Sequence, residues 1–317
     1  MSAHEALLPS LSIVIPVFKS EDSLSALIER LADELGQIAQ AFEVILVDDS
    51  SPDQSWMQIE TLSARYPWVR GIQLMRNYGQ HNALLCGIRA ARHDIIVTMD
   101  DDLQHPPDQI ALLLQKLADG YDVVYGAPQR EQHGLWRDLA SQVTKFTLRQ
   151  SMGIETAQNV SAFRAFRTQL RDAFATYQSP YVSIDVLLTW ATTRFATVRV
   201  RHEPRPYGTS TYTLRKLIRH TINMITGFSV LPLRLASILG FIMTIFGVGV
   251  LIYVIGRALV FGIVVQGFAF LASIIAIFAG AQLFALGIFG EYLARMYYRS
   301  LERPTYIVRT RIETSDG

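Results

Sequence analysis

In the first third of the chain, short apolar runs alternate with longer segments in which apolar residues recur at helical spacing. The runs have the length of buried strands, and the longer segments have the period of amphipathic helices. The predicted strands are 11–17, 42–47, 69–75 and 94–99, and the predicted helices are 23–38, one that is started by Pro52, and 80–91. This alternating order predicts an α/β domain whose largely parallel sheet is covered by helices.

The hydrophobic pattern changes abruptly in the last third of the chain. No residue is charged between Arg234 and Arg257, and none is charged over 258–290. Two apolar stretches, about 235–256 and about 268–290, are therefore long enough to cross a bilayer as helices. Two buried helices of a soluble core are the alternative, but soluble helices rarely lack a polar face over such a length. The pattern predicts two membrane spans.

Basic residues flank both predicted spans. They are Arg215, Lys216, Arg219 and Arg234 before the first span, and Arg295, Arg299, Arg303, Arg309 and Arg311 after the second. The loop between the spans carries Arg257 as its one charged residue. By the positive-inside rule, both flanks are cytosolic and the spans form a hairpin. We therefore expect an integral membrane protein of the cytoplasmic (inner) membrane, with the lipid bilayer as a partner and its large domain in the cytosol.

The segment 213–233, just before the first span, combines apolar residues at helical spacing with basic residues between them. This pattern predicts an interfacial helix that lies on the membrane, and a core helix of the soluble domain is the alternative. The expected parts of the chain are a cytosolic domain (1–212), an interfacial region (213–233), a transmembrane hairpin (234–294) and a cytosolic tail (295–317).

Glycines recur within each predicted span. Gly240 and Gly247 lie two helical turns apart in the first span, as do Gly280 and Gly287 in the second. Small residues on one helix face allow close packing with a neighbouring helix, so a homo-oligomer is one interpretation. Glycines that merely face lipid are the other.

Overall charge and cysteine content exclude some functions. The 29 basic and 28 acidic residues leave a formal charge of +1, which gives no support for nucleic-acid binding. A single cysteine, Cys86, excludes an internal disulfide and a cysteine-rich zinc site. Other chemistry must be sought in the polar residues that follow the predicted strands.

Three consecutive aspartates, Asp100, Asp101 and Asp102, follow the predicted strand 94–99. Carboxylates this close repel one another unless a cation neutralises them, and an oxygen-rich site of this kind favours Mg2+ or Mn2+. Such ions usually also bind substrate phosphates. A solvated acidic turn before a helix start at 106–107 is the alternative.

Ligands of parallel sheets bind beyond the carboxyl ends of the strands. Three polar segments of this chain, 16–19, 48–49 and 100–104, lie at such ends. We therefore expect them to converge on one site, which favours a functional interpretation of the acidic segment.

Motifs in this order resemble those of the polyprenyl-phosphate glycosyltransferases. The motifs are SIVIPVF (12–18), VDDSSPD (47–53), RNYGQHNA (76–83), DDDLQHPP (100–107) and RPYGTSTY (205–212), followed by paired spans that end in GEYL (290–293). The resemblance covers about residues 11–308 and extends to dolichol-phosphate mannose synthases and bacterial undecaprenyl-phosphate sugar transferases. It implies a membrane-tethered, inverting family 2 enzyme with a GT-A (Rossmann-like) catalytic domain.

The resemblance implies roles for the acidic segment. Asp100 and Asp102 match the Asp-x-Asp motif of the family, and Gln104 matches its metal-contacting glutamine. Together they would hold Mg2+ or Mn2+ against the diphosphate of the donor, with Asp100 also serving donor binding.

The resemblance also implies a nucleotide pocket. Asp48 or Asp49 matches the carboxylate that recognises the nucleotide base, and Pro16 and Phe18 would line the same pocket. Helix capping by the aspartates and the two serines that follow them is the alternative.

On the acceptor side, the resemblance points to basic residues. Arg130, Arg137 and Ser141 fall in the segment where similar enzymes position the acceptor phosphate, and Arg164 and Arg205 match two further basic positions. Each arginine alone could be a solvated surface charge. A phosphate dianion gives several of them a reason to converge.

The implied reaction is inverting transfer of a sugar from a nucleoside diphosphate to polyprenyl phosphate, undecaprenyl phosphate in bacteria, for cell-envelope glycan synthesis or modification. The acceptor phosphate, with a second pKa of about 6, is already mostly dianionic at neutral pH, so a strong general base is unnecessary. Two alternatives remain. A processive polysaccharide synthase would be expected to carry a Gln-x-x-Arg-Trp signature, which we do not find, and a noncatalytic membrane adaptor that binds nucleotide sugar would need no intact acidic motif.

Overall fold

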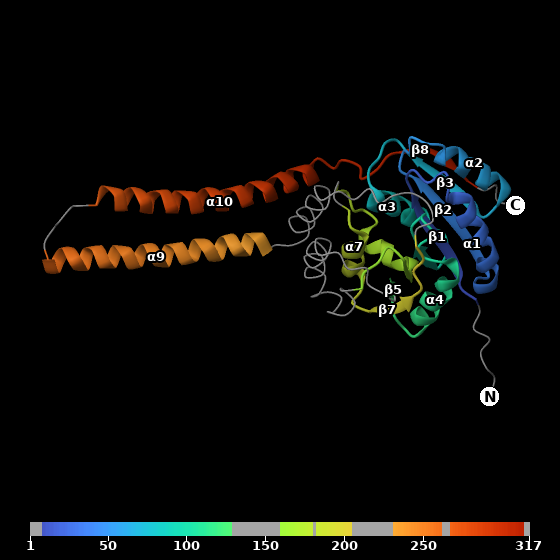
Figure 1. Cartoon of the computed structure of the whole chain (residues 1–317), viewed down its shortest axis with the longest axis horizontal. Coiled ribbons are helices and arrows are strands. Elements are labelled where there is room, and N and C mark those ends of the chain that lie inside the picture. The colour runs from blue at the N-terminus through green and yellow to red at the C-terminus, as the bar shows by residue number, and fades with distance from the viewer. Residues whose placement is uncertain (1–7, 129–158, 180–181, 205–230, 262–266, 314–317) are drawn as a thin grey trace, which may run out of the picture. The chain divides into compact units, whose positions relative to one another are not determined.

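The computed structural model describes residues 8–128, 159–179, 182–204, 231–261 and 267–313 (Figure 1). By its internal contacts the chain divides into two units. The first unit comprises Met1–Leu217 together with Glu302–Gly317, and the second comprises Ile218–Leu301. The second unit is therefore an insertion within the sequence of the first.

In the described part of the first unit, eight strands form one sheet in the order β7-β5-β6-β4-β1-β2-β3-β8 (Figure 1). The strands are β1 (Ser10–Val17), β2 (Ala41–Asp48), β3 (Val69–Leu74), β4 (Ile95–Thr98), β5 (Val123–Pro128), β6 (Arg164–Arg167), β7 (Phe195–Val200) and β8 (Val308–Ile312). The pairs β1–β2, β1–β4, β2–β3 and β5–β7 are parallel, whereas β3–β8, β4–β6 and β5–β6 are antiparallel. This mixed, mostly parallel sheet confirms the predicted α/β fold class.

Helices connect and cover the strands. They are α1 (Leu24–Ile38), α2 (Ser55–Arg65), α3 (Gln80–Ala90), α4 (Ile110–Ala118) and α7 (Ile184–Ala191), with short 3-10 helices η1 (Pro107–Gln109) and η2 (Thr168–Phe174). The first four strands and the first three helices lie where the apolar pattern predicted them, with ends that differ by a few residues.

Strand β1 is buried along its whole length because helices cover both faces of the sheet. Alternate residues, among them Ile13 and Ile15, pack in one apolar cluster with the buried side of α1. Val14 faces the other way, toward α3. A Cβ atom on Gly87 of α3 would lie 2.3 Å from Cγ1 of Val14, so this close approach of helix and strand requires glycine.

The C-terminal residues return to the sheet, which the sequence analysis did not predict. Strand β8 pairs antiparallel with β3, so that Ile312 lies opposite Gly71. Glu313 then forms an ion pair with Arg70 of β3 at 3.3 Å and another with Arg92. The region expected to be a tail after the second span therefore includes an edge strand of the domain.

The described part of the second unit consists of two long helices, α9 (Leu231–Phe261) and α10 (Phe268–Ser300). By length and composition, Pro232–Arg257 and Ile277–Tyr297 can each cross a membrane. Both segments overlap the predicted spans, although the second continues further toward the C-terminus. Most of the predicted interfacial region, 213–233, lies outside the described residues.

One of the predicted small-residue positions lies at the contact between these two helices. A Cβ atom on Gly247 of α9 would lie 2.9 Å from the ring of Phe278 on α10, and the rings of Phe246 and Phe278 stack with centroids 6.5 Å apart. Gly247 thus lets the two helices approach each other, while assembly of several chains stays a prediction.

Candidate active site

The loops that follow β1, β2 and β4 come together at one edge of the sheet, as the sequence predicted. Val17 pairs with Asp48, so the carboxyl ends of β1 and β2 lie at the same level, and β4 runs parallel to β1 on its other side. The backbone N–H of Lys19 donates to Oγ of Ser51 over 3.2 Å, which joins the first two loops. Of the candidate donor-binding residues, Phe18, Asp49 and Asp100 lie in these loops, and Pro16 and Asp48 lie at the carboxyl ends of β1 and β2.

The three aspartates after β4 have different surroundings. The carboxylate of Asp101 accepts hydrogen bonds from the hydroxyl of Ser20 and from the N–H of Phe18, the latter at 3.4 Å. Burial raises the pKa of Asp101 to about 6, against the lowering effect of the Ser20 hydrogen bond, and the charge of Asp102 adds to the rise. Asp101 therefore fastens the loop after β1, and Asp100 and Asp102 remain the candidate metal ligands.

The backbone of the acidic segment turns at Leu103. Its φ is +59°, in the left-handed region that a branched side chain adopts rarely, and its side chain is buried. The N–H of Gln104 donates to Oδ1 of Asp102 over 3.1 Å and closes the turn. The buried leucine anchors the segment, while its neighbours Asp102 and Gln104 are half-buried at the edge of the domain.

Asp100 is contacted by a residue that the sequence analysis did not single out. Nε2 of Gln80, the first residue of α3, donates to Oδ1 of Asp100 over 2.6 Å. The start of α3 is in turn held by the first residue after β2, because the carboxylate of Asp49 accepts the N–H groups of Tyr78 and Gly79, each at 2.7 Å. Gly79 has a φ of +95°, which favours glycine at this turn.

The candidate metal ligands form an oxygen-donor set. Within the described residues, no group of three or more His, Cys, Asp or Glu could hold a metal ion by itself. Mg2+ at nucleotide sites is usually held by one or two carboxylates together with phosphate oxygens and water, and oxygen ligands also suit Mn2+. Asp100, Asp102 and the amide oxygen of Gln104 therefore fit an ion that is bound jointly with a diphosphate.

The two aspartates predicted to recognise the nucleotide base are buried. Asp48 accepts a hydrogen bond from the N–H of Ser51 at 3.0 Å and one from Nε2 of Gln73 at 3.1 Å. Burial raises the pKa of Asp49 to about 6, although its two backbone hydrogen bonds oppose the rise. Helix capping is not their role, because α2 begins only at Ser55. Recognition of the base by either aspartate stays a prediction.

The two other residues of the predicted nucleotide pocket differ in exposure. Pro16 is buried within β1, whereas the side chain of Phe18 is 43% exposed. The ring of Phe18 lies beside the ammonium group of Lys19, 5.7 Å from the ring centroid. An exposed aromatic ring next to the acidic loop could stack on a planar base, so the prediction for this pocket rests mainly on Phe18.

Arg164, predicted to serve the acceptor, lies inside the domain. Its Nε donates to Oγ1 of Thr98 over 3.0 Å, and its guanidinium forms an ion pair with Asp185 of α7. The hydroxyl of Tyr125 donates to Asp185 over 3.0 Å. Burial would lower the pKa of Arg164, but attraction by Asp185 and Tyr125 outweighs it, so the guanidinium stays charged. Through these contacts Arg164 of β6 links β4 to α7. Contact of Arg164 with an acceptor phosphate stays a prediction.

Asp185 and Tyr125 were not found from the sequence. Electrostatics could have indicated that such a partner exists, because a buried arginine requires a carboxylate beside it. Spacing along the chain does not show which carboxylate it is. The other predicted acceptor residues, Arg130, Arg137, Ser141 and Arg205, lie outside the described residues.

Arg164→Ala is expected to lower the free energy of unfolding by about 3 kcal/mol, because it leaves the largely buried carboxylate of Asp185 without its charged partner. Arg167→Ala is the matched control. It lies on the same strand, its side chain is 40% exposed and its ion pair with Asp122 is long at 3.6 Å, so its effect should stay below about 1 kcal/mol. Thermal unfolding of the purified full chain measures both. Equal midpoints of thermal unfolding for the two variants would contradict the structural role of Arg164.

A mostly parallel α/β sheet with an acidic motif at its carboxyl edge is the arrangement of a GT-A glycosyltransferase. Residues 12–175, about half of the chain, match the family described as Glycosyl transferase family 2. The chain belongs to this family and is a glycosyltransferase, which confirms the resemblance seen in the sequence.

Curated relatives match almost the whole chain. The undecaprenyl-phosphate 4-deoxy-4-formamido-L-arabinose transferase of Pectobacterium carotovorum subsp. carotovorum (strain PC1) is 34% identical over 310 residues, which is 96% of this chain and 94% of that protein. The transferase of the same name from Proteus mirabilis (strain HI4320) is 34% identical over 312 residues, which is 98% and 95% of the two chains. The likeness therefore extends over the catalytic domain and the two long helices.

Solved structures support the fold. Glucosyl-3-phosphoglycerate synthase from Mycobacterium tuberculosis superimposes with a TM-score of 0.52 at 18% sequence identity, over 69% of this chain and 78% of that chain. At this identity the likeness bears on the fold alone.

Proposed function

We propose that this glycosyltransferase moves a sugar from a nucleoside diphosphate to undecaprenyl phosphate, for modification of the cell envelope. The observation that carries this proposal is the match to undecaprenyl-phosphate sugar transferases over 96% of the chain. Asp100, Asp102 and Gln104 lie together at the sheet edge where donors bind in such folds, which favours an enzyme over a noncatalytic adaptor. Two membrane-length helices in the described residues favour a single transfer over a polymer channel.

The donor would bind at the loops after β1, β2 and β4. Asp100, Asp102 and Gln104 would hold Mg2+ or Mn2+, which supplies positive charge against the leaving diphosphate. The synthase from Mycobacterium tuberculosis was crystallised with Mn2+ and uridine diphosphate, and this supports a metal-dependent donor site in the same fold. Gln80 orients Asp100 from α3, and Asp101 keeps the loop with Phe18 against the acidic segment.

The acceptor would need no strong general base. Its phosphate is mostly dianionic at neutral pH, so one of its oxygens can attack the anomeric carbon directly. The bond from that carbon to the diphosphate oxygen breaks, and its electron pair leaves with the nucleoside diphosphate. Attack from the opposite side inverts the anomeric centre. Arg130, Arg137 and Arg205, with Ser141, would orient the attacking phosphate and hold its charge.

The transfer would take place at the inner face of the cytoplasmic membrane. Two helices of membrane length and the basic residues beside them support a hairpin with the catalytic domain in the cytosol. The polyprenyl chain of the acceptor would stay in the bilayer while its phosphate reaches the domain.

The full chain in lipid nanodiscs that contain undecaprenyl phosphate tests this function. It should be incubated with Mn2+ or Mg2+ and a panel of UDP- and GDP-sugars that includes UDP-4-deoxy-4-formamido-L-arabinose. Mass spectrometry should detect an undecaprenyl phosphosugar with one of the donors. Donor hydrolysis without lipid product, or extension of a polysaccharide, would reject the proposal.

Arg205→Ala is expected to raise the apparent KM for undecaprenyl phosphate about tenfold and to leave donor binding unchanged, because a charge-assisted contact to phosphate is lost. Steady-state kinetics and calorimetric titration with the nucleotide measure the two effects. Arg194→Ala, an exposed arginine just before β7, is the control and should change neither. A selective loss of donor binding in Arg205→Ala would reject the acceptor role.

A further inference from the structure

The loop that follows β1 lies between two loops with different proposed roles. In the sheet, β1 has β2 on one side and β4 on the other, and the three strands are parallel. The candidates for base recognition are at the end of β2 and just after it, and the candidate metal ligands follow β4. A nucleoside diphosphate with its base at the first place and its diphosphate at the second must therefore pass the loop after β1.

Lys19 is the only lysine or arginine in these three loops, taken as residues 18–23, 49–54 and 99–106. Aspartate and glutamate are more numerous in the same segments. Like charges repel, so a diphosphate binds there only where cations offset the carboxylates. A bound metal ion supplies part of this positive charge, and Lys19 is the residue of these loops that can supply more.

The backbone of Lys19 is fixed between the two neighbouring loops. Its φ is +60°, in the left-handed region that residues other than glycine adopt rarely. Its N–H donates to Oγ of Ser51 after β2 over 3.2 Å. The N–H of Phe18 donates in the other direction, to the carboxylate of Asp101 after β4, over 3.4 Å. The loops on both sides therefore determine where the Lys19 side chain starts.

The ammonium group of Lys19 is available to a ligand. The residue is exposed, and Nζ lies 5.7 Å from the ring centroid of Phe18. Among the residues that the structure describes, this group forms no ion pair with a carboxylate. The positive charge of Lys19 thus lies next to the exposed ring that is proposed to stack on the base.

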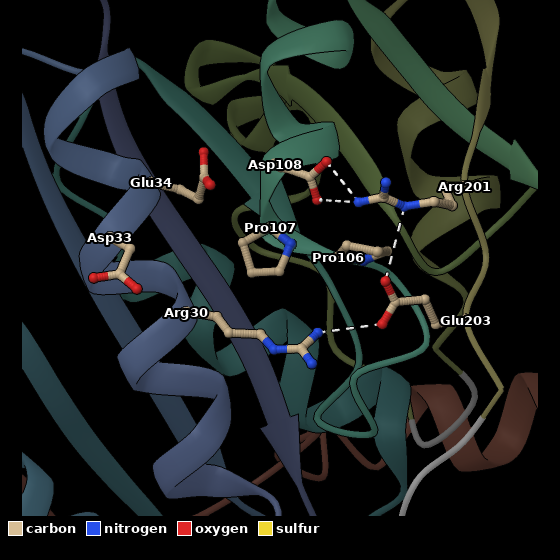
Figure 2. Close-up of a pocket in the computed structure, with 8 residues that line it drawn as sticks. All are labelled: Arg30, Asp33, Glu34, Pro106, Pro107, Asp108, Arg201 and Glu203. Carbon is tan, nitrogen blue, oxygen red and sulfur yellow. Dashed lines mark hydrogen bonds and ion pairs between the residues drawn. The ribbon is translucent and has the colours of Figure 1, made fainter.

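The cleft between α1 and the segment after β7 shows the opposite arrangement (Figure 2). Four carboxylates and two guanidinium groups line it, from Asp33, Glu34, Asp108, Glu203, Arg30 and Arg201. Both guanidinium groups already form ion pairs, that of Arg201 with Asp108 at 2.8 Å and that of Arg30 with Glu203 at 3.2 Å (Figure 2). The excess of negative charge disfavours a diphosphate in this cleft, in contrast to the surroundings of Lys19.

We propose that Lys19 is a donor-binding residue whose ammonium group contacts the phosphate next to the nucleoside. This inference rests on the proposed function, in which the donor is a nucleoside diphosphate sugar. A base that stacks on Phe18 brings that phosphate past Lys19 before the diphosphate reaches the metal ligands. A lysine meets phosphate as a point charge, and charge-assisted hydrogen bonds of this kind are strong.

The test compares Lys19→Asn and Lys19→Arg in the full chain in nanodiscs. Asparagine adopts the left-handed conformation more readily than most residues, so Lys19→Asn removes the charge and keeps the loop. Calorimetric titration with UDP, and in parallel with GDP, is carried out in the presence of Mn2+. Lys19→Asn should weaken binding of the nucleotide that the wild type binds about tenfold, and Lys19→Arg less than about threefold. The loss should shrink at high salt.

Lys116→Asn is the matched control, because it makes the same substitution at a lysine of α4. The ammonium group of Lys116 is paired with Asp119 at 3.0 Å, so this variant should bind the nucleotide as the wild type does. An equal loss of affinity in Lys116→Asn would show that only the overall charge of the domain matters, and the proposal would be rejected.

Shorter ligands decide which part of the donor meets Lys19. The corresponding nucleoside monophosphate should lose about the same factor in affinity, whereas the nucleoside, followed by ligand-observed NMR, should bind both proteins equally. A loss with the nucleoside would place Lys19 at the base or the ribose. A loss with the diphosphate alone would place it at the other phosphate. Either result would overturn the assignment.

The outcomes separate this inference from the proposed function. If Lys19→Asn binds nucleotide as tightly as the wild type, even where its thermal midpoint falls, Lys19 has at most a structural role and the inference is wrong. The proposed function then still stands wherever the wild type forms the lipid product. A wild type that binds nucleotide through Lys19 but forms no lipid product would refute the function and leave the inference intact. Binding of neither UDP nor GDP would refute both.

Discussion

Replacing Asp102 with asparagine is expected to lower turnover about a thousandfold while the domain stays folded. Asp102 lies half-buried at the edge of the sheet beside Gln104, and its carboxylate would contribute one of the charges that hold the metal ion against the diphosphate. An amide keeps the size and the hydrogen bond from Gln104 but removes that charge. Product formation at saturating donor and acceptor measures the loss, and titration with Mn2+ monitored by electron paramagnetic resonance should show weaker metal binding.

Asp101→Asn is the matched control, since it changes the neighbouring carboxylate in the same way. The Asp101 side chain accepts hydrogen bonds from Ser20 and Phe18, and an amide oxygen can still accept them, so this variant should keep most of its thermal stability and of its affinity for Mn2+. A chelator should abolish wild-type activity, and added Mn2+ or Mg2+ should restore it. If Asp102→Asn turned over at the wild-type rate in chelator, the assignment of the metal site would be wrong.

The parts of the fold that the sequence predicted are those with a strong local pattern. The predicted strand 94–99, for example, has four apolar residues among its six, and β4 forms at Ile95–Thr98 within it. The two long apolar segments likewise form the helices α9 and α10. Burial imposes such patterns because each buried position needs an apolar side chain, so the elements can be found without knowledge of their partners.

Strand β8 was not predicted because its local sequence pattern is weak. It is an edge strand with Arg309 and Arg311 in its five residues, and both side chains are exposed. Charged edge strands are common because they discourage pairing with other chains, but they show little apolar alternation. The partner of β8 is β3, which lies more than 200 residues earlier in the sequence. Only the assembled sheet shows that the two strands pair.

The candidate site was predictable at the level of segments and less so at the level of side chains. That the three loops converge follows from the parallel order of β1, β2 and β4. Three consecutive aspartates do not show which of them bonds to Ser20, and no residue pattern predicted the left-handed turn at Leu103. The ion pair of Arg164 with Asp185 depends on the antiparallel insertion of β6, an element that was not predicted.

Strand β8 follows the two long helices in the sequence but belongs to the sheet, so it limits how the membrane hairpin can be removed. A chain that ends at Thr211 loses β8, and with it the ion pairs of Glu313 and the side chain of Ile312 over Gly71. The edge of β3 would then be open, so we expect that fragment to aggregate. Replacing 213–301 by a flexible Gly/Ser linker of about 30 residues keeps β8 covalently attached and should give a folded domain that still binds nucleotide.

With undecaprenyl phosphate embedded in nanodiscs, the linker variant is expected to turn over about a thousandfold more slowly than the full chain, because tethering to the bilayer raises the effective concentration of the acceptor by a factor of this order. A water-soluble short-chain polyprenyl phosphate is the control acceptor, and with it the two proteins should differ by less than about tenfold. This contrast separates delivery of the lipid from the chemical step. Equal rates with the embedded acceptor would show that α9 and α10 have no part in delivery, and a loss of the same size with both acceptors would mean that the hairpin contributes to the catalytic site itself.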